Sequence, residues 1–322
     1  MKVLLFMDKL SSTPSKDEED TLLEAKEIEA ALLRLGHCVV ISSFSLNLER
    51  DNEIIDEERP NVIFNLVETL NSNSSLHLPS LIFEQRGLKY TGGNSASLFL
   101  TSDKVLCKKF LKKNRVPTAE FYYRGSTSIS SKLIEKEVII KPISDEASRG
   151  IDDDSIKIFK SKDEMKSFID NNPNLFIENF IDGREYNVSV MSIDSKVTVL
   201  PIAEMKFVDF PSNKPKILNY SSKWEEESFE YKNTRRSFDV LPGDEELIAQ
   251  LKSISKRCYT ELGGKGYLRV DFRVDKNNRP YVLEVNINPC ITSDSGFTAA
   301  CKQYGMNYDK MIKSIVEEAN NG

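Results

Sequence analysis

Two carboxylates and an amide lie close together near the end of the sequence, in a pattern that suits the binding of a divalent cation. Residues 266–289 alternate apolar and polar side chains on either side of a polar turn, which predicts a β-hairpin. Because side chains alternate between the two faces of a strand, Asp271 lies on the polar face of the first strand, and Glu284 and Asn286 share a face with Val282 on the second. Oxygen ligands of this kind suit Mg²⁺ that is also bound by phosphate and water. The alternative is an ordinary hairpin with one solvated face.

A second group of residues, upstream of the hairpin, suits the binding of phosphate. The apolar segment 137–142 predicts a buried strand with Lys141 near its end, and the following loop contains Ser148 and Gly150. Lys141 would supply a positive charge, and backbone N–H groups near Ser148 and Gly150 would bind phosphate oxygens. The chain lacks the pattern G-x-x-x-x-G-K-[ST], so this loop is not a P-loop.

The rest of the chain predicts the elements that must position these groups. Residues 1–94 alternate strands and helices, which predicts a small parallel α/β sheet whose ligands gather at the carboxyl ends of its strands. Its strands are expected at 3–7, 38–41, 61–67 and 89–91, and its helices at 17–35 and 80–86. Further strands are expected at 156–159, 175–180, 184–191 and 197–207, and further helical segments at 95–116, 244–262 and 308–319. Two polar segments, 9–20 and 225–239, are candidates for mobile lids.

The hairpin motif D-F-x-V-D, followed by Y-V-L-E-V-N-x-N-P, resembles the metal-binding end of ATP-grasp enzymes, and most of all the D-alanine–D-alanine ligase branch. The resemblance implies an α/β ATP-grasp fold with α+β character in its C-terminal part, preceded by a parallel α/β domain. We predict domains at 1–94, 95–180 and 181–322. The resemblance also implies ATP as a co-substrate and two Mg²⁺ ions, replaceable by Mn²⁺, which would be held by Asp271, Glu284 and Asn286.

Several segments match the family's nucleotide-binding residues. The sequence S-D-K at 102–104 resembles M-D-K, which implies that Lys104 reaches the ATP phosphates, and Lys223 matches the γ-phosphate lysine. Residues 177–185 fit the pattern V-E-x-F-I-x-G-x-E, in which Glu185 would bind the ribose hydroxyls. The residues that would frame the adenine are Glu178, Asn179, Phe180 and Ile181. For Phe180 and Ile181 the alternative is an ordinary place in the core.

Three further residues match the substrate side of the family. Glu68 follows the third predicted strand within N-L-x-E, and would bind a substrate ammonium unless it simply solvates a loop. Arg269 would stabilise the tetrahedral oxyanion that forms when the amine attacks. Ser295 lies at the offset of a serine that grips a substrate carboxylate.

The sequence departs from the family mainly where the amino acid substrates bind. The first loop lacks the glutamate motif G-G-x-S-x-E, and the serine and tyrosine of the substrate triad align with Ala147 and Trp224. Cys290 replaces a glycine whose N–H helps to hold the reacting carbonyl. These departures spare the ATP-binding residues, so we expect a main product other than D-alanyl-D-alanine.

The predicted function is that of an ATP-dependent, ADP-forming carbon–nitrogen ligase that makes an amide or peptide bond through an acyl phosphate. Such a reaction brings a carboxylate up to a triphosphate, so it depends on neutralising and aligning negative charges. Three alternatives stay open: a D-alanine–D-alanine ligase with an unusual triad, a ligase that tailors peptides or proteins, and a non-catalytic nucleotide-binding regulator.

The composition is that of a globular chain with small-molecule substrates. Of 322 residues, 39% are hydrophobic and 29% charged, and the net charge of −6 argues against a nucleic-acid partner. No apolar run is long enough to cross a membrane, and the first apolar run is too short for a signal peptide. Five scattered cysteines indicate a reduced, cytoplasmic compartment. The expected partner is an amino acid or peptide-like substrate, and the resemblance adds a homodimer as an expectation.

Overall fold

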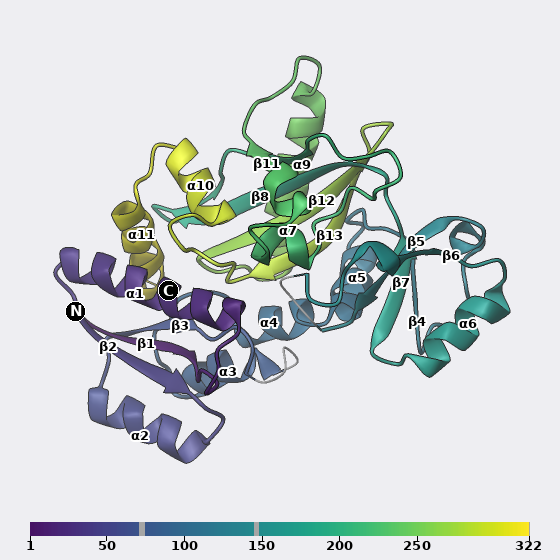
Figure 1. Cartoon of the computed structure of the whole chain (residues 1–322). Helices are drawn as coiled ribbons and strands as arrows, with labels where there is room; N and C mark the ends of the chain where they lie inside the picture. Colours follow the sequence, from purple (N-terminus) through teal and green to yellow (C-terminus); the bar gives the residue numbers. More distant parts are fainter. Residues whose placement is uncertain (71–74, 145–147, 322) are drawn as a thin grey trace.

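The computed structural model describes residues 1–70, 75–144 and 148–321, which form three sheets that follow one another along the chain. Figure 1 shows the N-terminal sheet at one end of the molecule, a small antiparallel sheet at the other, and the largest sheet between them. The predicted division at 94 and 180 remains an interpretation. None of the described helices is long and apolar enough to cross a membrane.

The N-terminal sheet is parallel and has the strand order β2-β1-β3. Alternate residues of the central strand face opposite sides: Val3 and Leu5 pack toward two helices on one side, and Leu4 and Phe6 toward two on the other. The strands are β1 (Lys2–Asp8), β2 (Cys38–Phe44) and β3 (Val62–Leu66). The helices are α1 (Lys16–Arg34) and α11 (Tyr308–Asn321) on the first side, and α2 (Leu48–Glu58) and α3 (Leu78–Gln85) on the second.

Two details of this part differ from the sequence-based expectations. The expected strand at 89–91 forms only a single bridge, between Ile63 and Tyr90. Helix α2 was not predicted, because its few apolar side chains, such as the buried Ile55, are spaced among charged ones.

The small antiparallel sheet has the order β4-β7-β5-β6. Its strands are β4 (Phe121–Tyr123), β5 (Glu137–Pro142), β6 (Ile156–Ile158) and β7 (Leu175–Asn179). Helix α6 (Lys162–Asn171) packs on it through Met165 and Ile169, which join Val138 and Ile177 in one apolar cluster. This confirms the strands predicted from Lys141 and from the segment that contains Glu178.

The largest sheet runs β11-β10-β8-β12-β13, with β9 paired to β8. Its strands are β8 (Gly183–Ile193), β9 (Lys196–Val199), β10 (Ala203–Phe207), β11 (Thr234–Ser237), β12 (Tyr267–Asp275) and β13 (Pro280–Ile287). The prediction of one strand at 197–207 is wrong, because Pro201, which has no N–H to donate to a ladder, separates β9 from β10. The segment 225–239 is partly regular, since it contains α8 (Phe229–Asn233) and β11.

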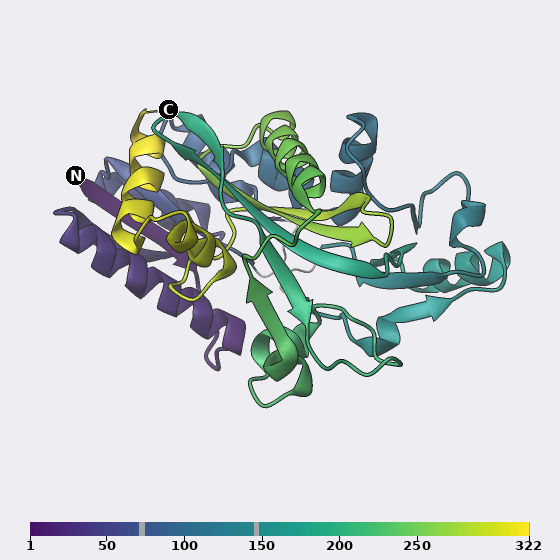
Figure 2. The same cartoon turned by 90° about the horizontal axis from the view of Figure 1, so that it is seen from above.

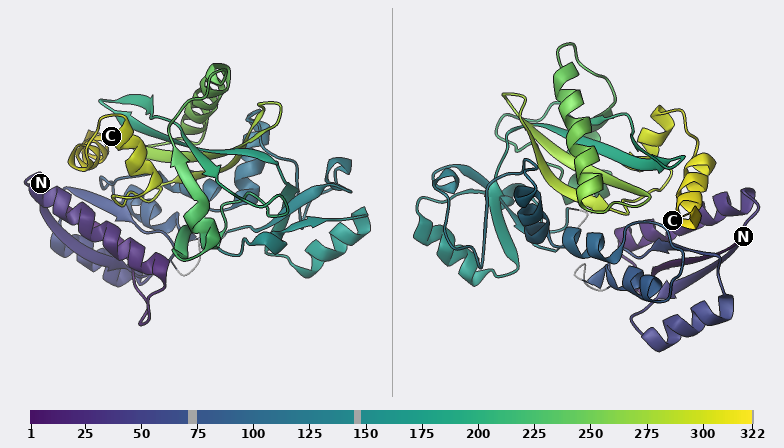
Figure 3. Two further views of the ribbon diagram at one scale, coloured as in Figure 1. Left: turned by 45° about the horizontal axis from the view of Figure 1, so that its top comes forward. Right: turned by 180° about the vertical axis from the view of Figure 1, so that it is seen from behind.

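Helices cover one face of this sheet and leave the other to the site. Helix α9 (Glu245–Glu261) crosses the covered face in the right-hand view of Figure 3. Its Leu247 and Leu251 share a cluster with Val270 and Phe272 of β12 and with Leu111. The other helices of this region are α4 (Ser95–Thr101) and α5 (Lys104–Lys113).

The two ends of the chain share one core. Helix α10 (Gly296–Gln303) contributes Phe297, and α11 contributes Ile312 and Ile315, to a cluster that also holds Val3 and Tyr267. Figure 2 shows α11 lying beside α1. The loop between β13 and α10 is therefore fixed between the largest sheet and the N-terminal helix.

Asp8 fastens the loop that follows β3. Its carboxylate accepts hydrogen bonds from the N–H groups of Glu68 (2.6 Å), Thr69 (3.0 Å) and Leu70 (2.8 Å). The side chain is 7% exposed, so water cannot easily replace it. Asp8 thus holds the backbone that carries Glu68.

We predict that D8A lowers the free energy of unfolding by roughly 1–3 kcal/mol, because three N–H groups lose a charged acceptor. Urea denaturation followed by circular dichroism would measure the change. The control is D309A, which removes an exposed pair with Arg34 and should cost about 1 kcal/mol at most. Equal unfolding midpoints for the two variants would contradict the prediction.

Candidate active site

The predicted convergence of ligands on the hairpin is present in the structure. Strands β12 and β13 pair Arg269 with Asn286 and Asp271 with Glu284. The Asn286 amide donates to Asp271 Oδ2 (3.0 Å) and to Glu284 Oε1 (3.4 Å). The two carboxylates and the amide therefore lie together on one face of the ribbon.

The prediction that Val282 shares this face is wrong. The register shifts so that Phe272 pairs with Val282, which leaves Leu283 as an extra residue, a β-bulge. Val282 is buried in the core with Phe272, and Leu283 turns toward the site. The alternation of side chains between the two faces is interrupted at a bulge, because the extra residue has no partner on the neighbouring strand.

Asp271 is surrounded by donors. Arg269 donates two hydrogen bonds to its oxygens, Nε to Oδ1 and Nη2 to Oδ2, both at 2.8 Å, and the Asn187 amide donates a third at 2.7 Å. Burial disfavours the charged form of Arg269, but attraction to Asp271 outweighs burial and raises the pKa of the guanidinium. Arg269 is therefore a fixed positive charge beside the carboxylate.

The donor set fits Mg²⁺, provided that other oxygens complete its shell. Protein sites for Mg²⁺ commonly supply one or two carboxylates and leave the remaining positions to phosphate and water. Asp271 and Glu284 are two such carboxylates, and Asn286 carries an amide oxygen. Among the described residues no group of three or more His, Cys, Asp or Glu side chains could hold a metal alone.

Four cations from four separate segments converge on Glu284. Burial by itself would raise the pKa of this carboxyl, but attraction to the cations lowers it to about 2. In order of influence the cations are Lys104, Lys223, Lys141 and Arg269. They come from the start of α5, from α7 (Tyr220–Trp224), from β5 and from β12, so only the folded chain brings them together.

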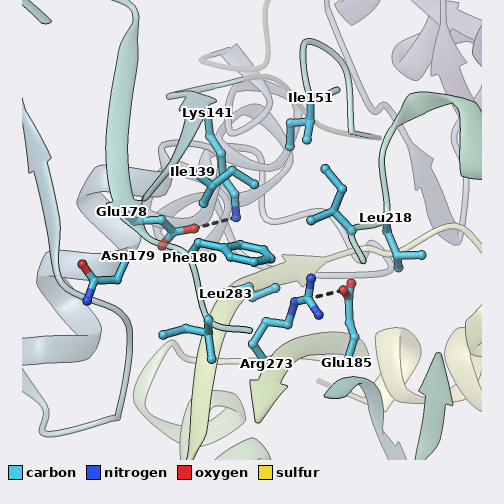
Figure 4. Close-up of a pocket in the computed structure, with 12 residues that line it drawn as sticks. Ile139, Lys141, Ile151, Glu178, Asn179, Phe180, Glu185, Leu218, Arg273 and Leu283 are labelled. Carbon is cyan, nitrogen blue, oxygen red and sulfur yellow. Dashed lines mark ion pairs between the residues drawn. The ribbon is translucent and has the colours of Figure 1, made fainter. Parts of the chain in front are cut away.

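A pocket opens beside these charges, between the small sheet and the largest sheet (Figure 4). It contains Lys141 and all the residues that the resemblance assigned to the adenine and the ribose: Glu178, Asn179, Phe180, Ile181 and Glu185. The other lining residues were not predicted: Ile139, Ile151, Ile217, Leu218, Arg273 and Leu283. Most of these are single apolar residues without a motif, and only the approach of two sheets makes them a pocket wall.

Glu178 holds two lysines at the back of this pocket. Its carboxylate pairs with Lys108 Nζ and Lys141 Nζ, each at 2.5 Å, and its side chain is fully buried. Burial raises the pKa of Glu178, but the two lysines lower it further, so that the net shift is downward. Lys108 also donates to Thr118 Oγ1 (2.9 Å), which ties α5 to the segment before β4.

Arg273 and Glu185 form a second buried pair across the pocket, at 3.3 Å (Figure 4). Arg273 donates to the carbonyl oxygens of Gly183 (3.0 Å) and Lys216, and its guanidinium lies over the Phe180 ring. Burial raises the pKa of Glu185, an effect that Arg273 opposes. Arg273 thus holds Glu185 in place.

Ser148 and Gly150 lie in the loop between β5 and β6, as predicted. Both have positive φ, +61° and +69°, and the Ser148 hydroxyl donates to the carbonyl of Leu218 at 2.8 Å. The loop therefore packs against the segment that leads to Lys223. Ala147, assigned to the triad serine position, lies outside the described residues.

Three residues that the resemblance places at the substrate end, Glu68, Ser295 and Cys290, form hydrogen bonds with other protein groups. Thr21 of α1 donates to Glu68 Oε2 at 3.3 Å. The Ser295 hydroxyl caps α10 by accepting from the Thr298 N–H at 3.2 Å. The Cys290 thiol donates to Asp20 at 3.6 Å. Whether any of these groups touches a substrate stays a prediction.

Acidic residues of α1 that were not predicted fasten the loop after β13. The Ile291 N–H donates to Glu24 Oε1 at 2.6 Å, and Ser293 donates through its N–H (2.7 Å) and its hydroxyl (2.6 Å) to Glu27. Burial, helped by the nearby Asp20, raises the pKa of Glu24 to about 8. The spacing of Asp20, Glu24 and Glu27, which places them on one helix face, was the available sequence signal.

Comparisons with known proteins agree with this arrangement. A family model described as D-ala D-ala ligase C-terminus matches residues 127–317. A D-alanine–D-alanine ligase of Pelagibacter ubique is 26% identical, with 97% of each chain covered. One of Aquifex aeolicus is 25% identical, over 98% of this chain and 100% of its own. A Sinorhizobium fredii protein described as uncharacterized is also 25% identical, over 92% of this chain and 87% of its own.

Solved structures show the same fold. The D-alanine–D-alanine ligase of Bacillus anthracis complexed with ATP has a TM-score of 0.73 and 22% identity, covering 100% of this chain and 98% of that one. The D-alanyl-alanine synthetase A of Vibrio cholerae has a TM-score of 0.74 and 14% identity, covering 100% and 99%. The ATP-grasp fold expected from the hairpin motif is thereby confirmed.

We predict that E178Q destabilises the protein by about 3–5 kcal/mol at neutral pH, because it leaves two buried lysines without a counter-charge. The folded-state pKa of Glu178 is depressed below 4.5, so its contribution is complete above pH 4.5 and is lost as the pH falls through the folded-state pKa. The difference from wild type should therefore shrink in acid. Urea denaturation at several pH values would measure it.

The matched control for this experiment is E120Q. Glu120 pairs with Lys112 at 2.8 Å on the surface, where an ion pair contributes about 1 kcal/mol or less. If E178Q and E120Q had the same free energy of unfolding at neutral pH, the buried ion pairs of Glu178 would not contribute the predicted stability.

Proposed function

Since the chain belongs to the D-alanine–D-alanine ligase family of ATP-grasp enzymes and is an ATP-dependent, ADP-forming ligase, we propose that it activates a carboxylate as an acyl phosphate and joins it to an amine. The substrates are amino acids or peptide-like molecules. The product is an amide or peptide bond, with release of ADP and phosphate.

The observation that carries this proposal is the convergence of Lys104, Lys141, Lys223 and Arg269 on Glu284, next to a pocket lined by apolar side chains. A nucleotide base would occupy the apolar pocket, and its phosphates would extend toward the cations. The lysines attract phosphate oxygens, so they favour the approach of a second anion, the substrate carboxylate. Asp271, Glu284 and Asn286 would hold Mg²⁺, which would neutralise further negative charge on the phosphates.

The two chemical steps need different groups of the chain. In the first step a substrate carboxylate oxygen attacks the γ-phosphorus and ADP leaves. In the second step the amine attacks the acyl carbon, which develops negative charge on its oxygen before phosphate leaves. Arg269, partly buried and held by two hydrogen bonds to Asp271, is the positive charge proposed for that oxygen.

Lys223 fits a phosphate-binding role because its surroundings disfavour its charge until an anion arrives. Burial and the nearby Arg269 lower the pKa of Lys223, while Glu284 and Asp271 oppose that shift. A bound phosphate would add to the attraction that these two carboxylates supply. Lys141 would likewise exchange part of its pairing with Glu178 for phosphate.

We propose a main product other than D-alanyl-D-alanine. Trp224 stands at the triad tyrosine position, and its carbonyl oxygen accepts a hydrogen bond from Lys16 of α1 at 2.8 Å. Cys290 places a thiol where family members have a glycine, and that thiol faces Asp20. The substrate end is therefore shaped by side chains that the family pattern does not contain. A D-alanine–D-alanine ligase proper is the second candidate, favoured by the names of the curated relatives.

We predict that purified enzyme with Mg-ATP releases phosphate rapidly with at least one pair from a panel of amino acids and dipeptides, and only slowly with D-alanine alone. A coupled phosphate assay with mass spectrometry of the products would test both statements. Rapid turnover of D-alanine would establish the second candidate instead. Failure of every pair would favour a non-catalytic nucleotide-binding protein.

We predict that E284Q lowers kcat by at least about a hundredfold, because the Mg²⁺ that would neutralise the phosphates loses one of its carboxylate ligands. The Mg²⁺ concentration needed for half-maximal rate should rise as well, since one carboxylate ligand is gone. Phosphate release at varied Mg²⁺ would measure both, with E261Q, an exposed glutamate at the end of α9, as control. An unchanged Mg²⁺ requirement would argue against Glu284 as a ligand.

A further inference from the structure

Arg236 of β11 is a charged residue on the site's face of the largest sheet that the family pattern does not assign. Strand register places it there. Arg236 pairs with Met205, Met205 pairs with Glu185, and Glu185 pairs with Arg273. Residues that pair directly across strands share a face. Arg236 therefore lies on the face that carries Glu185 of the pocket.

The charged end of Arg236 reaches the loop that precedes α10. Its Nη1 donates to the carbonyl oxygen of Asp294 at 3.4 Å. A Cβ added to Gly296 would lie 3.5 Å from its Nη2. Between these two residues is Ser295, the residue expected to grip a substrate carboxylate. Arg236 thus brings a full positive charge to the place where the resemblance supplies only a hydroxyl.

Arg236 is available for an anion. Among the residues that the structure describes, its one hydrogen-bond partner is a carbonyl oxygen, and no carboxylate lies within ion-pair distance of it. The side chain is exposed to solvent, yet surrounding protein and the nearby Arg269 lower the pKa of its guanidinium, while Asp294 opposes the shift. Two arginines thus share one region of the cleft, and an anion placed between them would relieve their repulsion.

We propose that Arg236 binds the carboxylate of the amine-donating substrate, and so selects an amino acid or peptide with a free carboxylate over a simple amine. The inference rests on the proposed ligase activity. It makes Arg236 a specificity residue of the substrate end. The nucleotide phosphates are a less suitable ligand, because Arg236 does not line the nucleotide pocket and is not among the cations that most affect Glu284.

Arg235 offers a matched control on the same strand. It pairs with Lys206, one residue along from the Arg236–Met205 pair, so its side chain lies on the opposite face of the sheet. Its Nη1 donates to the carbonyl of Thr234 at 3.4 Å, and it is exposed like Arg236. R235Q and R236Q therefore remove the same charge from opposite faces.

The experiment compares phosphate release by wild type, R236Q, R236K and R235Q. The amine donors are amino acids and dipeptides that the wild type uses, each tested with a free carboxylate and as its C-terminal amide. R236Q should raise KM for the free carboxylate form by about tenfold to a hundredfold, the loss of a charged hydrogen bond. It should leave KM for the amide and KM for ATP unchanged. R236K should recover part of the loss, and R235Q should match wild type.

Two results would overturn the proposal. One is an equal effect of R236Q on the carboxylate and amide forms, which would indicate a general disturbance of strand β11. The other is a rise in KM for ATP alone, which would place Arg236 on a phosphate. If wild type releases no phosphate with any pair, the proposed ligase activity is itself wrong, and the role proposed for Arg236 is wrong as well. Thermal unfolding would verify that each variant folds.

Discussion

Charge balance at the centre of the molecule is the constraint on which the rest of the structure depends. Buried carboxylates and buried cations are each costly alone and acceptable only in close pairs. Glu178 lies between Lys108 and Lys141, Asp271 holds Arg269, and Glu284 lies in the field of four cations. These groups come from α5, β5, β7, α7, β12 and β13, so the two sheets and both helices must be in place before all of the charges are neutralised.

The same pairing of buried charges suggests why the site can accept a triphosphate without rearranging its buried side chains. Phosphate brings negative charge to lysines that already lie at the pocket, and a divalent cation would bring positive charge to carboxylates that already lie together. The substrate end also contains acidic side chains, in addition to Arg236 and Arg269. Asp20, Glu24 and Glu27 of α1 face the loop after β13, and Glu24 and Glu27 are held by its N–H groups. The reacting groups would therefore meet between the cations that surround Glu284 and the acidic side chains of α1.

Features set by neighbouring residues in the sequence could be predicted more readily than features set by contacts between distant segments. Strand alternation alone places Arg269 with Asp271 on one strand and Glu284 with Asn286 on the other, but the pairing of Asp271 with Glu284 depends on the bulge, which alternation does not predict. The carboxyl-end loop of β3 could also be placed, whereas its anchor on Asp8 could not, because sixty residues separate the partners. The pocket wall and the contacts of the α1 acids depend on packing between distant segments, which the sequence does not give directly. The split at Pro201, by contrast, follows from a local signal, a proline inside a predicted strand.

The bulge in β13 is the clearest case in which the site departs from the regular alternation of side chains along a strand. In a regular strand Leu283 and Glu284 would point to opposite faces, and one of the two side chains would face the core and not the site. The extra residue breaks the alternation, so that two neighbouring side chains face the site together. Leu283 then belongs to the apolar wall of the pocket and Glu284 to the charged cluster beside it. A single strand thereby joins the surface suited to a nucleotide base with the surface suited to its phosphates, which fixes the distance between them.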